Sequence, residues 1–469
     1  MTIHDLTAFP AGFRWGAATA AYQIEGGAGE GGRGASIWDT FSHTPGLVLN
    51  GDNGDIAVDH YHRWPADLDL MVELGIKHYR LSLSWPRLQP TGAGELNPEG
   101  VAFYRDLLDG MRARGIEPLV TLYHWDLPQA LEDEGGWANR DTAYRFAEYA
   151  SRVIAELGLL ATDWITINEP WCISFLGYGY GVHAPGKRNT RLAVAAAHHV
   201  NLAHGLALAA IRLINPALRV SNSNLVTDIV PATDSDDDAA AVLRLDAMNN
   251  RIFLDPVYHG SYSAAVHELF DEYGLAELIH DGDLELIGAP VDFMGLNHYQ
   301  RVVVSASEDG GYLKLTETPA EPATTSFGWS VEPDSLRSVL RRISSEFTTL
   351  PIYVTENGAS YDDYADPNGS VNDWPRVEYF SGYLAAAAEA IREGVNLQGY
   401  YAWSFLDNFE WAEGYSKRFG LVYVDYPTQK RIPKQSALWY RQLIADHEDA
   451  TASAVAAIQQ KMREPLREQ

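Results

Sequence analysis

Short apolar runs alternate along this chain with longer segments in which apolar residues repeat every three or four positions. The short runs are rich in β-branched and aromatic residues and predict strands, whereas the longer period predicts amphipathic helices. The predicted strands are 13–17, 78–83, 118–123, 164–167, 218–221, 293–296, 352–354 and 397–402. The predicted helices are 65–74, 103–111, 144–157, 193–213, 336–343 and 379–391. Strands that alternate with helices are typical of parallel β/α units. The pattern therefore predicts an α/β protein.

Eight strands with intervening helices close most economically into a single (β/α)₈ TIM barrel. An open doubly wound sheet is the alternative, but it normally carries a glycine-rich nucleotide loop after an early strand. The glycine-rich segment 26–32 has neither the spacing of a dinucleotide-binding motif nor the Lys-Ser/Thr of a P-loop. We therefore expect a barrel with elaborated loops at the C-terminal face of its strands.

No linker rich in Gly, Ser or Pro divides the sequence, so we expect one domain over residues 1–445. The remaining residues, 446–469, form a C-terminal tail rather than a second domain. Within this tail the stretch 452–462 predicts either a short amphipathic helix or a frayed end.

Polar side chains follow the predicted strands at nearly every C-terminal end, which is where a barrel of this type places its chemistry. In chain order these residues are Gln23, Arg80, His124 with Trp125, Asn168 with Glu169, Asn224, Asn297 with Tyr299, Glu356 and Trp403. Most of these side chains can hydrogen-bond neutral hydroxyl groups or move protons. Such a set predicts a site for a hydroxyl-rich ligand.

Two glutamates, Glu169 and Glu356, occupy equivalent places at the ends of the fourth and seventh predicted strands. Either local motif alone is also compatible with an ordinary turn or helix cap, so the pair carries the prediction. Cleavage of a glycosidic bond with retention needs two carboxyl groups about 5–5.5 Å apart, one as nucleophile and one as proton donor. Arg80, late on the second strand, is suited to keep one of them ionised. The 13 Trp and 25 Tyr residues, many beside polar residues, suit stacking on sugar rings.

Several long motifs resemble those of glycoside hydrolase family 1, the β-glucosidases and their relatives. They include Thr-Ile-Asn-Glu-Pro at 166–170, Tyr-Val-Thr-Glu-Asn-Gly at 353–358 and the segment 13–26. Further matching segments are 80–85, 122–128, 297–299 and 403–411, in the family's order. The resemblance runs from about residue 9 to residue 440, nearly the whole chain.

The resemblance implies that Glu356 is the nucleophile and Glu169 the general acid/base. It implies that Tyr299 hydrogen-bonds the nucleophile, that Arg80 keeps it charged, and that Asn297 supports the site. The implied substrate-binding residues are Gln23, His124, Trp125, Asn168, Glu410 and Trp411 around the sugar, Trp403 beneath it and Trp329 beside the aglycone. Asn224 matches the family pattern less securely.

The resulting expectation is a retaining exo-β-glycosidase that removes terminal non-reducing β-D-glucosyl residues from unphosphorylated O-glycosides and β-linked disaccharides. A glutamate at position 169 favours O-glycosides over thioglycosides, because thioglucosidases resembling this pattern carry glutamine there. Glu410 would repel a sugar phosphate. The alternatives are a preference for β-galactosides or β-fucosides, transglycosylation on the same scaffold, and a non-catalytic sugar-binding barrel.

The composition of the chain limits the kinds of binding partner and the cellular location that we expect for the protein. The formal net charge of −28 disfavours nucleic acid and anionic membranes as partners, because the field repels polyanions. We find no secretory signal pattern and no run of about 18 apolar residues, and the single cysteine excludes an internal disulfide. We therefore expect a cytoplasmic enzyme with a small glycoside substrate, no membrane partner, no cofactor and no metal. Cys172 is interpreted as a buried structural thiol, and the sequence leaves open whether the chain forms a homo-oligomer.

Overall fold

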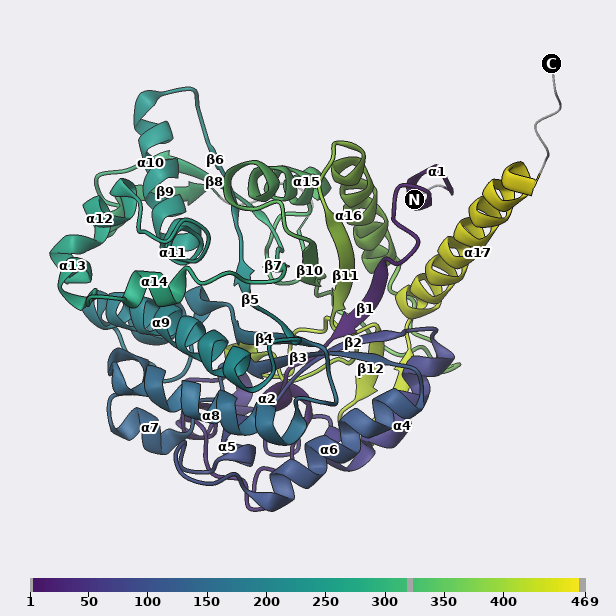
Figure 1. The fold of residues 1–469 in the computed structure, drawn as a ribbon, viewed down its shortest axis with the longest axis horizontal. Helices are drawn as coiled ribbons and strands as arrows, with labels where there is room; N and C mark the ends of the chain where they lie inside the picture. Colours follow the sequence, from purple (N-terminus) through teal and green to yellow (C-terminus); the bar gives the residue numbers. More distant parts are fainter. Residues whose placement is uncertain (1–2, 319–323, 464–469) are drawn as a thin grey trace.

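Eight parallel strands form a closed barrel at the centre of the molecule (Figure 1). This computed structural model describes residues 3–318 and 324–463. Around the barrel the strand order is β1-β11-β10-β7-β5-β4-β3-β2. The barrel strands are β1 Arg14–Ala18, β2 His78–Ser82, β3 Glu117–Tyr123, β4 Asp163–Asn168, β5 Arg219–Leu225, β7 Met294–Asn297, β10 Ile352–Asn357 and β11 Leu397–Trp403. All eight predicted strands are present, and the predicted TIM barrel is confirmed.

Helices follow the strands and surround the barrel (Figure 1). The main ones are α4 His60–Glu73, α6 Pro98–Ala113, α8 Asp141–Leu157, α9 Thr190–Ile214, α11 Ile252–Tyr258, α15 Pro333–Arg342, α16 Trp374–Arg392 and α17 Gln435–Arg463. Each of the six predicted helices corresponds to one of these. The stretch 452–462 is not a separate helix, because it continues α17 without a break, and Figure 1 shows α17 extending away from the barrel.

Helix α9 is long and apolar enough to cross a membrane by length and composition, with a mean hydropathy of 1.3 in its most apolar window. It packs against α8, however, and 83% of that window is buried inside the fold. A largely buried apolar helix of this kind is explained by the core that it helps to form.

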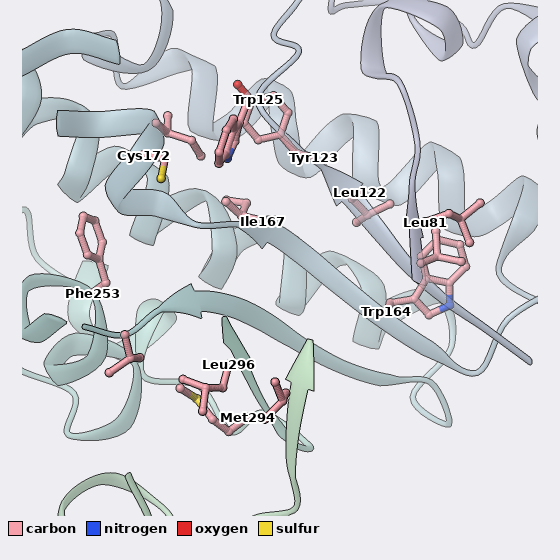
Figure 2. Packing of buried hydrophobic residues seen from close by; sticks show 14 of the residues in the cluster. Leu81, Leu122, Tyr123, Trp125, Trp164, Ile167, Cys172, Phe253, Met294 and Leu296 are labelled. Carbon is pink, nitrogen blue, oxygen red and sulfur yellow. The ribbon is translucent and has the colours of Figure 1, made fainter. Parts of the chain in front are cut away.

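Alternating side chains of the strands build two apolar clusters. The inner cluster fills the barrel and includes Leu119 of β3, Ile165 of β4 and Tyr353 of β10. The outer cluster lies between the strands and the helices, and Figure 2 shows part of it, including Leu122 and Trp164. Because neighbouring residues of a strand point to opposite faces, one sequence run supplies both clusters. The strands are thereby fixed on both sides, which makes their C-terminal ends a rigid platform.

Two small sheets lie in the loops outside the barrel. Strands β6 Asp228–Pro231, β8 Arg301–Ala306 and β9 Leu315–Thr318 form one, and β12 Val422–Asp425 pairs with β13 Lys430–Pro433 in the other. These loops and the connections after β3, β4 and β11 provide the elaborated C-terminal face that the sequence predicts.

Candidate active site

A cavity of about 500 Å³ opens at the C-terminal ends of the barrel strands. Its wall is formed by side chains from the ends of β3, β4, β10 and β11 and from the loop after β7. Nine of the predicted site residues line it, namely His124, Trp125, Glu169, Tyr299, Trp329, Glu356, Trp403, Glu410 and Trp411. The two glutamates that are 187 positions apart in sequence therefore face one space.

Glu356 is the second-last residue of strand β10 and accepts two strong hydrogen bonds. Arg80 Nη1 lies 2.5 Å from its Oε1, and the Tyr299 hydroxyl donates to its Oε2 at 2.6 Å. The Arg80 and Glu356 side chains are 1% and 4% exposed, so water does not screen this ion pair. Burial raises the pKa of Tyr299 well above its usual value, and the phenol therefore keeps the proton that it donates. Both oxygens of Glu356 are thus held by donors.

Glu169 has different partners, although it also follows a strand end. Its backbone adopts a left-handed φ of 47°, between Asn168 and Pro170. Asn297 Nδ2 donates to Oε1 at 2.6 Å, and the Cys172 thiol donates to Oε2 across 3.0 Å. Burial and the charge of nearby Glu356 raise the pKa of Glu169 to about 7. This carboxyl group is therefore suited to carry a proton near neutral pH.

The strands are irregular where they deliver these two groups. The pairing of β4 with β5 shifts register between Ile165 and Asn168, and the pairing of β10 with β7 shifts between Val354 and Glu356. Such irregularities re-aim the side chains that follow them. Both catalytic candidates thus leave the regular alternation of their strands and enter the cavity.

A hydrogen-bonded chain of Arg80, Asn168 and Asn297 connects the two glutamates behind the cavity wall. Arg80 Nη2 donates to Asn168 Oδ1 at 2.6 Å, and Asn297 Nδ2 donates to the same oxygen at 3.0 Å. Because a guanidinium can only donate, the atom of Asn168 that it contacts must be the oxygen. This fixes the orientation of both amides, including the Asn297 group that donates to Glu169.

The same chain sets the tautomer of His124. With its oxygen facing Arg80, Asn168 presents Nδ2 to His124 Nε2 at 3.0 Å, so Nε2 accepts and Nδ1 carries the proton. Burial and the charge of Arg80 lower the pKa of His124 well below its usual value, so the ring is neutral. His124 Nδ1 has no partner among the described residues, which makes it a donor available to a ligand.

Gln23 and Glu410 form a hydrogen-bonded pair, of which Glu410 lines the cavity. Gln23, in α2 Ala21–Ile24, donates through Nε2 to Asn408, to the Phe409 carbonyl and to Glu410 Oε2. Its buried Oε1 has no partner among the described residues. Burial and nearby Glu356 raise the pKa of Glu410 to about 8. These groups leave one acceptor and one exchangeable proton for the hydroxyls of a ligand.

Aromatic rings complete the inner half of the cavity. Trp403 and Trp411 both lie nearly parallel to His124, with centroids 5.9 and 6.0 Å from it. Trp411 also stacks on Tyr22, which holds its indole in place. Trp125 packs against Trp411 at 4.6 Å, and its indole N–H donates to the backbone carbonyl of Asn168. Flat rings beside hydroxyl-binding groups are the arrangement that suits a pyranose.

The outer half of the cavity is more apolar. Trp329 stacks on Phe327 at 4.4 Å and contacts Tyr299 at 5.2 Å, and so it borders the inner half. The other apolar residues of this half include Trp171, Leu176, Tyr180, Val182, Leu245, Met248 and Leu313. This half can therefore enclose an apolar group attached to the sugar.

Gln23, Arg80, Asn168 and Asn297 lie behind the lining residues and hydrogen-bond them, whereas Asn224 is turned away from the cavity. Its neighbour on β5, Ser223, points inward and donates to Asn297 Oδ1 at 2.9 Å. Strand alternation then turns Asn224 to the other face, where its Oδ1 accepts from Asn222 at 3.5 Å. Leu225, the last residue of β5, and Val226, which follows it, line the cavity in place of Asn224.

Cys172 is the residue whose place the sequence reasoning missed. The thiol is buried, as predicted, but it lines the cavity and contacts Glu169. The sequence offered one signal for this contact. Cys172 follows Glu169 by three residues at the start of the helix η3 Cys172–Tyr180, and this spacing places both side chains on the same side of one helical turn.

Among the described residues, no group of three or more His, Cys, Asp or Glu side chains is placed to hold a metal ion. The positive charges of Lys417 and Arg418 near the cavity are engaged by protein partners. Lys417 donates to the Ser326 carbonyl at 2.7 Å, and Arg418 pairs with Asp407 at 2.6 Å.

Comparisons with known proteins agree with this geometry. The family model described as glycosyl hydrolase family 1 matches residues 6–449. Beta-glucosidase A of Thermotoga maritima is 44% identical over 443 residues, which cover 94% of this chain and 98% of that protein. A bifunctional beta-D-glucosidase/beta-D-fucosidase of Bifidobacterium breve is 46% identical over 462 residues, with 94% and 98% covered.

Solved structures show the same likeness. The structure of beta-glucosidase from Thermotoga maritima in complex with deoxynojirimycin superimposes with a TM-score of 0.91 at 44% identity. The superposition covers 94% of this chain and 99% of that chain. The similarity therefore extends over the barrel and the loops that form the cavity.

Proposed function

The chain belongs to glycosyl hydrolase family 1, and from this premise we propose that it is a retaining β-glucosidase acting on terminal non-reducing β-D-glucosyl residues. One observation carries the proposal. Two carboxyl groups face a single sugar-sized cavity in unlike surroundings, Glu356 between a guanidinium and a phenol, and Glu169 with a pKa raised to about 7. Double displacement at a sugar carbon requires such a divergence of roles.

In the first step Glu356 acts as the nucleophile and Glu169 as the acid. A Glu356 oxygen forms a bond to the anomeric carbon while the bond from that carbon to the leaving oxygen breaks. The proton of Glu169 moves to the leaving oxygen, so the aglycone departs as a neutral alcohol. Arg80 and Tyr299, which contact Glu356, orient the attacking carboxylate.

In the second step the roles of the carboxyl groups reverse. Glu169, now a carboxylate, takes a proton from a water molecule whose oxygen attacks the anomeric carbon. The bond to Glu356 breaks, the glucose leaves with its original configuration, and Glu169 is again protonated. The raised pKa of Glu169 permits both states to be populated near neutral pH.

The sugar is recognised by His124 and Gln23, each with a polar atom that has no partner among the described residues, and by Glu410. His124 Nδ1 donates and Gln23 Oε1 accepts, and Glu410 bridges the far hydroxyls of the ring above the Trp403 floor. The engaged side chains of Lys417 and Arg418, together with the carboxyl group of Glu410, favour an unphosphorylated sugar. The apolar outer half of the cavity suits aryl and alkyl aglycones as well as a second sugar stacked on Trp329.

Fucoside hydrolysis is a second activity to test, because the Bifidobacterium breve relative is named as a bifunctional glucosidase and fucosidase. A fucoside lacks the hydroxyl at C6, so its use depends on how much binding Glu410 and Trp411 contribute at that end of the ring. Nitrophenyl β-glucoside, β-galactoside and β-fucoside should be compared by kcat/KM, with cellobiose as the natural disaccharide.

The expected result is the highest kcat/KM for the glucoside and release of the β-anomer of glucose as first product, as seen by NMR. Release of the α-anomer would contradict a retaining mechanism, and absence of turnover with all four substrates would favour a non-catalytic sugar-binding barrel. Accumulation of longer glycosides at high acceptor concentration, in place of glucose, would identify a transglycosylase.

A further inference from the structure

The two oxygens of Glu169 have partners of very different strength. Asn297 Nδ2 donates to Oε1 at 2.6 Å, whereas the Cys172 sulfur lies 3.0 Å from Oε2. The Asn297 amide cannot turn around, since Arg80 fixes Asn168 and Asn168 fixes Asn297. The hydroxyl oxygen of a protonated carboxyl group is a weaker acceptor than the carbonyl oxygen, so the short bond from Asn297 favours Oε1 as the oxygen without the proton. The proton of the acid form therefore resides on Oε2, the oxygen beside the thiol.

The thiol remains protonated in this place. Burial and the charge of Glu169 raise the pKa of Cys172 well above its usual value. The group is therefore an S–H donor while Glu169 is a carboxylate, and its sulfur can accept weakly once Oε2 carries a proton. A thiol forms only weak hydrogen bonds in either role, so neither state of Glu169 is strongly favoured by it.

The backbone holds Cys172 at this position. Its N–H donates to the Glu169 carbonyl at 3.0 Å, and the thiol is 5% exposed at the first residue of η3. The contact with Oε2 is thus made within one tight turn that contains Pro170, rather than by a flexible side chain from elsewhere.

We propose that Cys172 is a positioning residue whose weak S–H donor holds Oε2 of Glu169 in place without fixing its protonation state. The inference rests on the proposed function, because only a group that must gain and lose a proton in each cycle benefits from a weak partner. A hydroxyl at this position would favour the carboxylate, and an apolar side chain would favour the acid.

Other groups around Glu169 contribute to its protonation and must stay constant in the test. The titratable and charged groups that face it are Glu356 of β10, Arg80 of β2, Tyr299 after β7, Glu410 after β11 and Cys172 itself. A substitution at position 172 replaces only the thiol and leaves the other four groups in the sequence, so a changed pH profile reports the thiol contact.

The experiment compares wild type with Cys172→Ser and Cys172→Val by the pH dependence of kcat/KM. The substrates are octyl β-glucoside, whose leaving group needs the proton of Glu169, and 2,4-dinitrophenyl β-glucoside, whose leaving group does not. Ser174→Ala is the matched control, because this buried hydroxyl in the same helix donates to the Pro170 carbonyl and contacts no carboxylate.

With octyl β-glucoside, Cys172→Ser should shift the alkaline limb to lower pH by about 0.5–1 unit, because a hydroxyl is a stronger donor to the carboxylate. Cys172→Val should shift it to higher pH by a similar amount, and Ser174→Ala should leave it unchanged. Above the limb, Cys172→Ser should lose about 3–10-fold with octyl β-glucoside and little with the dinitrophenyl substrate.

The two variants are expected to shift in opposite directions, so either one that folds decides the question. Alkaline limbs that coincide with that of wild type, or equal losses with both substrates, would show a purely structural role and overturn the inference. Failure of the proposed function is distinguishable, because wild type itself would then not hydrolyse either glucoside.

Discussion

The C-terminal ends of β4 and β10 carry the same type of residue in contrasting surroundings. Glu356, on β10, contacts a guanidinium and a phenol, and both are donors that favour a carboxylate ready to attack. Glu169, after β4, contacts an amide and a thiol and is raised in pKa to about 7 by burial and by the charge of Glu356. The two carboxyl groups therefore have different hydrogen-bond partners before any substrate binds.

This contrast shows that position in the barrel does not by itself assign a role. Both glutamates lie at strand ends, both are buried and both line one cavity. The difference comes from Arg80, whose Nη1 reaches Glu356 while its Nη2 reaches Asn168 instead of Glu169. This cation, together with the different hydrogen-bond partners of the two glutamates, gives the two carboxyl groups unlike surroundings.

Replacement of the nucleophile should have the largest effect. Glu356→Ala removes the group that forms the covalent bond, so kcat should fall on the order of 10⁴-fold or more. Azide added to an activated β-glucoside should restore part of the turnover and yield the α-glucosyl azide, which NMR identifies. Wild-type rates in this variant would overturn the assignment of Glu356.

Replacement of the acid should have a smaller effect that depends on the substrate. Glu169→Ala should lower kcat/KM about 10²–10⁴-fold for alkyl glucosides, whose leaving groups need a proton, and much less for dinitrophenyl glucoside. Azide should here yield the β-glucosyl azide, since it attacks the intermediate formed on Glu356. If the two variants gave azides of the same configuration, the division of roles described above would be wrong.

Removal of one hydrogen-bond donor to Glu356 should reduce kcat/KM by a smaller factor than replacement of either glutamate. Tyr299→Phe removes the hydroxyl that contacts Glu356 Oε2 at 2.6 Å and keeps the ring that packs against Trp329. A hydrogen bond to a charged group contributes about 1.5–3 kcal/mol, so kcat/KM should fall about 10–100-fold. Ser326→Ala, at a residue outside the cavity wall, serves as the control and should retain wild-type kcat/KM.

The smallest predicted effect is on the free energy of unfolding. Replacing Glu169 by Gln should raise it at pH 8, whereas replacing Glu356 by Gln should lower it. With a pKa raised to about 7, folded Glu169 holds a proton that the unfolded chain releases above about pH 4.5, so stability falls as pH rises between these values. Glu169→Gln should therefore increase the free energy of unfolding at pH 8 by about 1–3 kcal/mol, and the gain should vanish near pH 4.5.

Glu356→Gln, at the same pH, should instead destabilise the fold, because it leaves the buried Arg80 guanidinium without its carboxylate. Urea unfolding of both variants at pH 8 and at pH 4.5 tests the comparison. Equal changes at the two positions would show that their surroundings are electrostatically alike.

Much of this architecture could be predicted from the sequence. Short apolar runs located all eight barrel strands, because a strand covered on both faces needs such runs. The polar residues at the strand ends, such as His124 and Glu169, followed from the rule that chemistry gathers at one end of the barrel. The sequence did not show that Asn224 is turned away from the cavity or that the stretch 452–462 continues α17. A local pattern determines neither the facing of the last residues of a strand nor the length of a helix.

The sequence by itself determined the barrel, the pair of glutamates and the kinds of side chain around them, because periodicity and residue type act over short distances along the chain. Only the tertiary structure decided that Arg80 also contacts Asn168, that Cys172 contacts Glu169 and that Asn224 faces away from the cavity. These contacts join residues on different strands or depend on a shifted register and a left-handed backbone at Glu169. A hydrogen bond tolerates errors of only a few tenths of an ångström, and that precision arises when the packed core fixes all the strands at once.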